Sequence, residues 1–197
     1  MNHCMNFIKK YNPDKSENDL EIIQYGLEGL YLTISKLVII LLLSIILGIF
    51  KEVIIFLLIY NIIRTPSFGL HATKSWICLL SSTCIFIGVP FLCNQFILPI
   101  YIKIIIGLIS IVLIFKNAPA DTYKRPIISK KRRQMYKLIS TIVAITMIVL
   151  AIVAKNQFIS NSLIFALVVQ NFMISPMIYH LFKLPYANYK NYVVDIA

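Results

Sequence analysis

The sequence predicts an all-α integral membrane protein with about six transmembrane helices. Of its 197 residues, 59% are hydrophobic and only 14% are charged. A soluble domain of this length could not keep so much apolar surface from water, whereas a helical bundle can expose it to lipid. The apolar residues gather in runs of about 20, the length that a helix needs to cross a bilayer. This composition disfavours a disordered chain, a fibrous repeat and a secreted disulfide scaffold.

Six spans are expected, separated by short polar or charged stretches. They are residues 33–50, 53–70, 75–92, 96–115, 138–154 and 158–182. Helices are expected despite the abundant isoleucine, because an open sheet would leave backbone groups unpaired in lipid. The second span is the weakest, since Pro66 and Gly69 favour a short or broken helix there.

An amphipathic segment precedes the first span. Apolar side chains recur at helical spacing from Leu20 to Tyr31, and acidic and amide side chains occupy much of the remainder. We expect residues 1–32 to form a cytoplasmic segment, with an interfacial helix or a soluble cap. Residues 33–182 then form the transmembrane domain, and residues 183–197 form a cytoplasmic tail. No cleavable signal is expected, because a polar, mixed-charge stretch precedes the first apolar run.

Positive charge is distributed unevenly between the two ends of the expected bundle. Sixteen of the 19 Lys and Arg residues fall on the side of the two termini and of the connection 116–137. The other side has Lys51, Lys103 and Lys155. Because basic loops stay in the cytoplasm, both termini and this basic connection are expected there. Lys103 lies within a span, and its long side chain is expected to reach the outer interface.

The segment 64–82 carries the best candidates for catalysis. It places His71 seven residues before Cys78, at the start of the third span. A thiolate nucleophile needs a base or a cationic neighbour, and imidazole supplies both. On one continuous helix the two Cα atoms would lie roughly 10.5 Å apart. Contact therefore requires the helix to begin near Thr73 or Ser75, so that Cys78 lies in its first turn and His71 folds over from the preceding loop.

Other polar residues of this region have alternative interpretations. Arg64 either anchors a span end at the headgroups, or binds a peptide carboxylate or stabilises the active site. Gly69 is either a helix terminator or a residue that gives the loop its conformational freedom. Ser75 and Ser82 could donate to an oxyanion, although serines in membrane helices usually bond to backbone or to a neighbouring helix. No metal or other cofactor is expected, because the nearby histidine and cysteines lack a clear fourth ligand.

This pattern resembles the accessory gene regulator B (AgrB) family. The resemblance spans nearly the whole chain and rests on Arg64, Ser67, Phe68, Gly69, His71, Ala72, Cys78 and Ser82, with Ala118–Thr122 and Pro126 downstream. It implies a multi-pass cysteine endopeptidase of the bacterial cell membrane. Such enzymes cleave the C-terminal part of the AgrD autoinducer propeptide and promote thiolactone cyclisation of a quorum-sensing peptide. The resemblance makes His71 and Cys78 the catalytic residues and implies a homodimer.

The basic connection has two expected partners. Its charge favours anionic membrane lipids, while it lacks the aromatic platform or motif of a nucleic-acid binder. The resemblance adds the acidic C-terminal tail of the propeptide, which six cations could attract: Lys124, Arg125, Lys130, Lys131, Arg132 and Arg133. Asp121 either orients His71 as a third group or pairs with nearby cations.

The alternative function is a small transporter or exporter of a peptide or another solute, without peptidase chemistry. In a transporter, intramembrane charges should face a pathway at the midplane, and broken helices should occur in two matching halves. Here the charges crowd one edge of the membrane, and the sequence shows no such pair of broken helices. The peptidase is therefore the favoured prediction.

Overall fold

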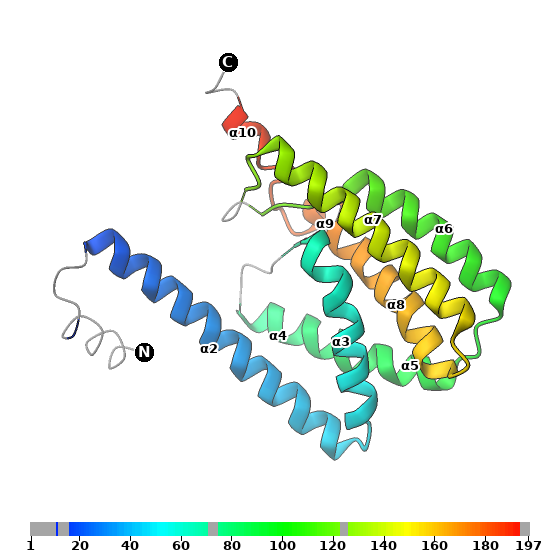
Figure 1. Ribbon diagram of the computed structural model, residues 1–197. Coiled ribbons are helices and arrows are strands. Elements are labelled where there is room, and N and C mark those ends of the chain that lie inside the picture. The colour runs from blue at the N-terminus through cyan, green and yellow to red at the C-terminus, as the bar shows by residue number, and fades with distance from the viewer. Residues whose placement is uncertain (1–10, 12–15, 71–74, 123–125, 194–197) are drawn as a thin grey trace. The chain divides into compact units, whose positions relative to one another are not determined.

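The computed structural model describes residues 11, 16–70, 75–122 and 126–193. Within these residues the regular elements are helices, and an isolated parallel bridge joins Phe68 and Ala120. The chain divides into two compact units, residues 1–43 and residues 44–197. Figure 1 labels the helices along the chain.

Helix α2, Glu17–Ile46, is one continuous helix of 30 residues. Ser16 caps its first turn, because its hydroxyl accepts a hydrogen bond from the Asp19 N–H at 3.2 Å. The chain leaves the helix through Gly48, whose φ of 69° suits glycine after a helix C-terminus. The helix is about 45 Å long, more than the hydrocarbon core of about 30 Å. The amphipathic segment and the first span therefore share one helix, part of which extends beyond the hydrocarbon if the helix crosses the bilayer.

Helix α3, Phe50–Ser67, corresponds to the second expected span. One face of it, including the fully buried Phe56, packs in the hydrophobic core of the larger unit, where α3 lies beside α7 and α8. The helix ends one residue after Pro66, and Phe68 and Gly69 then have φ values of 56° and 120°. The prediction that the helix ends near Pro66 and Gly69 is confirmed.

The third span is helical from Ser75 to Gln95 but changes its winding part-way. Helix α4, Ser75–Thr83, continues through a π-helical turn, η1, Cys84–Gly88, into α5, Val89–Gln95. Pro90 accounts for this turn, because proline has no N–H for the carbonyl four residues earlier and its ring would clash with that carbonyl. The wider turn lets the helical run continue past the proline.

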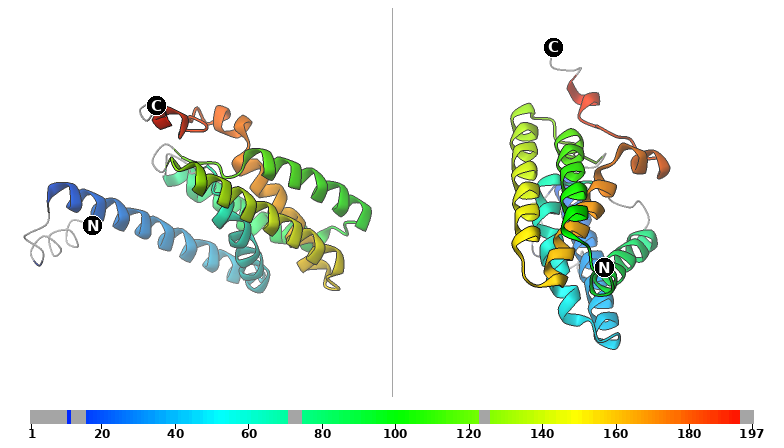
Figure 2. Two further views of the ribbon diagram at one scale, coloured as in Figure 1. Left: turned by 45° about the horizontal axis from the view of Figure 1, so that its top comes forward. Right: turned by 90° about the vertical axis from the view of Figure 1, so that its right-hand side faces the viewer.

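Three long helices lie side by side in the larger unit (Figure 2): α6, Ile100–Asn117, α7, Lys130–Val153, and α8, Gln157–Ile174. Gly107 lets α6 approach α7, because a Cβ there would lie 3.0 Å from the Ile148 side chain. Helix α8 is the most buried of the three and contacts α3, α5, α6 and α7. It is the central helix of this unit.

The basic connection 116–137 is not a loop throughout, contrary to the expectation. Lys130–Lys137 form the first two turns of α7. Ser129 caps this helix, because its hydroxyl accepts a hydrogen bond from the Arg132 N–H at 3.4 Å. The long cationic side chains are compatible with helix, so charge alone did not reveal where the loop stops.

The sixth span also ends earlier than expected. Helix α8 stops at Ile174, and Pro176 begins the short helix α9, Pro176–Leu181. Proline suits the first turn of a helix but interrupts its interior, which explains the break. A final helical turn, α10, spans Lys190–Val193.

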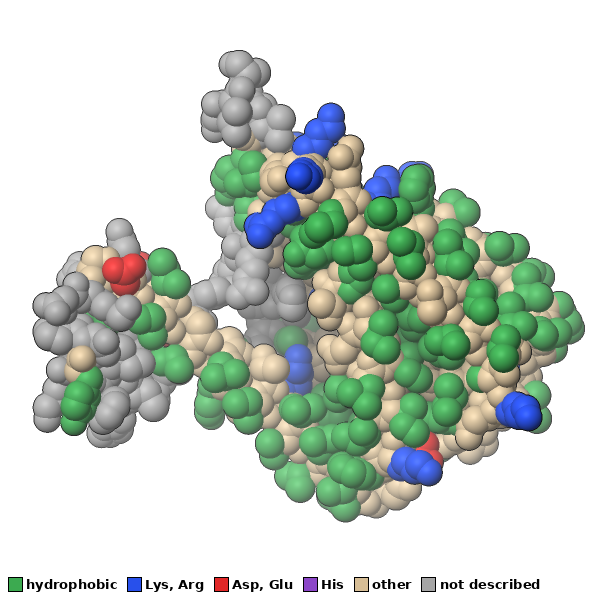
Figure 3. All heavy atoms as spheres, in the orientation of Figure 1, with side chains coloured by type: hydrophobic (Ala, Val, Ile, Leu, Met, Phe, Trp, Pro, Cys, Tyr) green, Lys and Arg blue, Asp and Glu red, His purple; other side chains and the backbone are tan. Residues whose placement is uncertain are grey.

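Five helical runs in the described residues are long and apolar enough to cross a membrane: Asp19–Ile46, Trp76–Gln95, Ile100–Asn117, Lys130–Val153 and Gln157–Ile174. Helix α3 is not among them, and its 18 residues include Lys51, Glu52 and Arg64. Hydrophobic side chains cover much of the face shown in Figure 3. Such a surface suits lipid rather than water. The chain is an all-α, multi-pass integral membrane protein, as predicted.

The expectation that Lys103 reaches the interface is wrong. Its side chain is 7% exposed, and its Nζ donates a hydrogen bond to the Ser160 hydroxyl at 2.7 Å. The Ser160 hydroxyl in turn donates to the Ala151 carbonyl. A charged group inside a membrane bundle needs a polar partner, and this hydroxyl provides one between α6 and α8.

Candidate active site

A backbone reversal after α3 leads directly into the predicted catalytic segment. Its four residues, Ser67–Leu70, end immediately before His71. Phe68 has φ 56° and ψ −138°, a conformation that costs a bulky residue on the order of 1–3 kcal/mol. Such a conformation persists only where the surroundings hold it. Contacts from α3, α8 and the loop after α6 hold it here.

Arg64 supplies the first set of contacts. Its guanidinium donates to three successive backbone carbonyls, from Nη1 to Phe68 at 2.7 Å, and from Nη2 to Leu70 at 2.8 Å and Gly69 at 3.3 Å. Five N–H donors in a rigid fork suit this task, and a lysine ammonium could not reproduce it. These contacts fit the interpretation of Arg64 as a residue that stabilises the site.

Gln170 supplies a contact that the sequence did not suggest. It lies on α8 with no exposed surface, and its Nε2 donates to the Phe68 carbonyl at 2.8 Å. Its Oε1 is buried without a hydrogen-bond partner among the described residues. An amide directly after the apolar run 163–169 was the available signal, because polar groups inside membrane helices usually bond to a neighbouring segment.

Backbone hydrogen bonds fix the reversal from two further sides. The Gly69 N–H donates to the Ala120 carbonyl at 2.9 Å, and the Ala120 N–H donates to the Ser67 carbonyl at 3.0 Å. The Leu70 N–H donates to the Met173 carbonyl at 2.9 Å. The loop after α6 and the last turn of α8 therefore both hold the chain where it approaches His71.

Both the backbone conformation at residue 69 and the lack of room for a Cβ atom require glycine at this position. Its φ of 120° is rarely adopted by residues with a side chain. A Cβ at this position would overlap Nη1 of Arg64 and lie 2.9 Å from the Met173 carbonyl oxygen. The arginine fork and α8 can approach the reversal this closely because residue 69 has no side chain.

Cys78 lies in helix α4, Ser75–Thr83, and is half-buried. The described part of this helix starts at Ser75, three residues before Cys78, so the start of the helix near Thr73 or Ser75 stays a prediction. Ser82 is half-buried in the last turn of the same helix. His71 lies in residues 71–74, outside the described part of the chain. The position of the imidazole relative to the thiol therefore stays a prediction.

Asp121 holds the C-terminal segment. It is 3% exposed, and its carboxylate accepts hydrogen bonds from the N–H groups of Asn188 at 3.0 Å, Tyr189 at 2.9 Å and Ile127 at 3.4 Å. The pKa of the neighbouring Tyr186 is raised, by burial first and then by Tyr189 and Asp121. Because Asp121 follows Ala120, this carboxylate steadies the loop that pairs with the reversal.

The predicted substrate-binding cations do not share one environment. Lys130, Lys131 and Arg132 are exposed at the start of α7. Arg133 instead donates from Nη1 to the Ile127 and Ile128 carbonyls at 2.9 and 2.8 Å, and its guanidinium lies 3.8 Å from the centre of the Tyr189 ring. Lys124 and Arg125 lie outside the described residues. Three of the six cations are therefore available at the surface of the described structure.

A reversal held at the end of α3, followed by a half-buried cysteine in α4, occurs here in a multi-pass membrane protein. The family model for accessory gene regulator B (AgrB) matches residues 1–174. The chain belongs to the AgrB family. Membership of this family gives the chain a role in the accessory gene regulator quorum-sensing system.

Relatives support the same assignment. An AgrB-like protein of Clostridium acetobutylicum is 27% identical over 91% of this chain and 87% of its own length. An AgrB-like protein of Listeria welshimeri is 30% identical over the same shares of the two chains. AgrB-like protein 2 of Clostridium perfringens is 34% identical over 59% of this chain and 58% of its own length. No solved structure matches the chain.

Proposed function

We propose that this AgrB-family protein is a membrane cysteine endopeptidase that processes an AgrD-like propeptide. Cys78 is the nucleophile and His71 is the general base and acid. The observation that carries the proposal is the pair of elements on either side of residues 71–74. The reversal Ser67–Leu70 is held by Arg64, Gln170 and backbone bonds, and the half-buried Cys78 follows in α4.

The first half of the proposed reaction cleaves the propeptide. His71 takes the proton of the Cys78 thiol, and the thiolate attacks the carbonyl carbon of the scissile amide. The C–N bond breaks, and His71 returns the proton to the leaving amine. The C-terminal fragment departs, and the rest of the propeptide stays on Cys78 as a thioester.

The second half closes the ring. A cysteine within the bound peptide, deprotonated by His71, attacks the thioester carbonyl, and the Cys78 thiolate leaves and takes the proton back. One thioester is exchanged for another, so this step needs no ATP. Water must be kept from the acyl-enzyme, and a half-buried thiol at the start of a membrane span supports that requirement. Conversion of an amide into a thiolactone is uphill, so removal of a product has to draw the reaction forward.

The exposed cations at the start of α7 suit the acidic tail of the propeptide. Lys130, Lys131 and Arg132 present three positive charges on one turn. Attraction of this kind weakens with ionic strength and acts on binding rather than on bond breaking. Neutralising Lys124, Arg125, Lys130 and Lys131 together should therefore raise KM and leave kcat nearly unchanged.

The charge distribution supports a cytoplasmic position for both termini and for the site. We also propose a homodimer in the bacterial cell membrane, on the strength of the family alone. Cross-linking of the protein in native membranes tests the dimer. A single species of monomer mass at saturating cross-linker would contradict it.

Coexpression with a candidate propeptide tests the enzyme itself. Mass spectrometry should find the C-terminal fragment, the cyclic product and a peptide adduct on Cys78. Cys78→Ala should remove all three, while Cys84→Ala, which changes an exposed cysteine on the same helical run, should retain them. Movement of an uncleaved peptide across the membrane by Cys78→Ala would favour the transporter alternative instead.

A further inference from the structure

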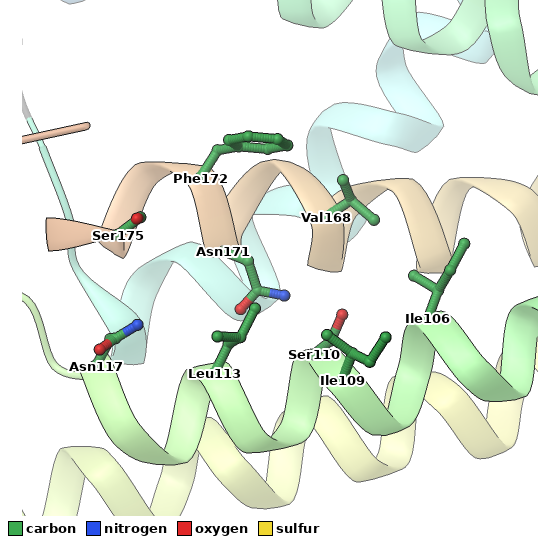
Figure 4. Close-up of a pocket in the computed structure, with 9 residues that line it drawn as sticks. All are labelled: Ile106, Ile109, Ser110, Leu113, Asn117, Val168, Asn171, Phe172 and Ser175. Carbon is green, nitrogen blue, oxygen red and sulfur yellow. The ribbon is translucent and has the colours of Figure 1, made fainter. Parts of the chain in front are cut away.

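A groove of about 250 Å³ lies between α6 and α8 (Figure 4). Its walls are largely apolar and include Ile106 on α6 and Phe172 on α8. Four polar side chains also line it: Ser110 and Asn117 from α6, Asn171 from α8, and Ser175 directly after α8. None of its nine lining residues carries a charge.

Polar groups concentrate toward one end of the groove. Asn117 is the last residue of α6, and Ser175 follows the last residue of α8. One turn inside this end, the amide oxygen of Asn171 is buried without a hydrogen-bond partner among the described residues. An unsatisfied amide in an apolar wall is costly. Rotation of this amide can offer either a donor or an acceptor to a ligand.

The groove has the length of one membrane leaflet. Ile106 and Asn117 are eleven residues apart on α6, which corresponds to about 16 Å along the helix axis. Half of a hydrocarbon core is about 15 Å. The groove therefore runs from the polar end, where α6 and α8 stop, to near the middle of the bilayer.

The exposure of the groove and the positive charge at its polar end indicate which class of ligand it binds. Ile109 and Phe172 are 54% and 56% exposed, so the groove opens sideways to the surface that lipid covers. Lys116 is exposed beside Asn117 at the polar end, in the last turn of α6. A helix with its side chains is 10–12 Å wide, too wide to enter a groove of this volume. A single acyl chain is narrow enough.

We propose that this groove binds one phospholipid with an anionic headgroup. Its phosphate lies near Lys116, the Asn171 amide turns so that its NH2 group donates a hydrogen bond to an ester carbonyl, and one acyl chain follows the apolar walls toward Ile106. The site is independent of the proposed peptidase chemistry, because none of its lining residues takes part in that reaction.

Brominated lipids, which quench tryptophan fluorescence on contact, test the proposal in reconstituted full-length protein. The chain has one tryptophan, Trp76, which Trp76→Phe removes. In that background, Phe172→Trp places a reporter in the groove. Leu108→Trp is the matched control, because Leu108 is 59% exposed on α6 but does not line the groove. The probes are brominated phosphatidylglycerol and brominated phosphatidylcholine in phosphatidylcholine vesicles.

At the Phe172→Trp reporter, phosphatidylglycerol should bind about fivefold more strongly than phosphatidylcholine, the effect of roughly one lysine near an anionic lipid. At the Leu108→Trp control the ratio should be close to one. Lys116→Gln and Ser110→Phe, which remove the charge and fill the groove, should each bring the reporter's ratio down to that of the control. Equal ratios at the two positions in the otherwise unchanged chain would overturn the proposal, whether or not the filling variant folds.

Discussion

Replacement of Gln170 by methionine should separate the stability of this protein from its proposed cleavage activity. The two side chains are similar in length and volume, so the change removes polar atoms without opening a large cavity. The wild-type side chain donates one hydrogen bond, to the Phe68 carbonyl, and leaves its buried Oε1 unpaired among the described residues. These two features act in opposite directions on the free energy of unfolding.

The magnitudes decide the outcome. A hydrogen bond of this kind contributes about 0.5–1.5 kcal/mol, and an unpaired buried acceptor costs about 1–3 kcal/mol. The Phe68 carbonyl keeps Arg64 as a donor after the change. The free energy of unfolding of Gln170→Met should therefore stay within about 1 kcal/mol of the wild-type value, or exceed it. The Phe68 carbonyl in the reversal before His71 loses one of its two donors, and kcat for cleavage should fall about fivefold, equivalent to ~1 kcal/mol.

Two measurements on the same preparation check this prediction. Thermal unfolding in detergent reports stability, and propeptide cleavage in reconstituted vesicles reports kcat. Gln157→Met is the control, because Gln157 is exposed at the start of the same helix, and both quantities should stay at wild-type values. A loss of more than about 2 kcal/mol with unchanged kcat would refute the reasoning, since Gln170 would then support the bundle rather than the reversal.

Three further predictions test the site and the topology. Gly69→Ala should lower cleavage by about 10- to 100-fold while the protein still inserts into the membrane, because the positive φ and the overlap with Arg64 cost on the order of 1–3 kcal/mol at the reversal. Cleavage within twofold of the wild-type rate would contradict this prediction. His71→Gln should lower cleavage by about two to four orders of magnitude, the contribution of general acid and base catalysis, and should slow alkylation of Cys78 at neutral pH; no change in either would leave His71 as a loop residue. In single-cysteine variants, Ile128→Cys should react with impermeant thiol reagents from the cytoplasm and Asn156→Cys from outside, and the opposite pattern in intact cells would invert the proposed orientation.

The features that the sequence predicted well depend on local composition. Apolar runs located the five described helical runs that are long and apolar enough to cross a membrane, because bilayer thickness sets the length of a crossing helix. The second expected span, residues 53–70, is not among them. Pro66 and Gly69 located the end of α3. Proline interrupts a helix and glycine permits a positive φ, and both effects are independent of the rest of the fold. A helix from residue 75 onward followed from the apolar run there, and Cys78 lies in it.

The features that the sequence missed depend on contacts between distant segments. Gln170 and Phe68 are 102 residues apart in the chain, and the acceptor is a backbone carbonyl, which every residue possesses. The same holds for Asp121, whose carboxylate accepts hydrogen bonds from backbone N–H groups 67 and 68 residues away. Backbone partners carry no side-chain signature, so composition could not reveal either contact.

The central helix α8 gives these ideas a combined test, because it serves two sites from different faces. Gln170 bonds to the reversal, and a Cβ on Gly69 would meet Ile174 at 3.3 Å, so these two residues face the proposed catalytic segment. Asn171 and Phe172 line the groove. At 100° per residue, the two pairs lie on different sides of the helix. Substitutions at 170 and 174 should therefore lower cleavage and spare lipid preference, while those at 171 and 172 should do the reverse. If α8 merely filled the core, burial alone would order the effects, and the fully buried Gln170 and Ile174 would dominate both measurements.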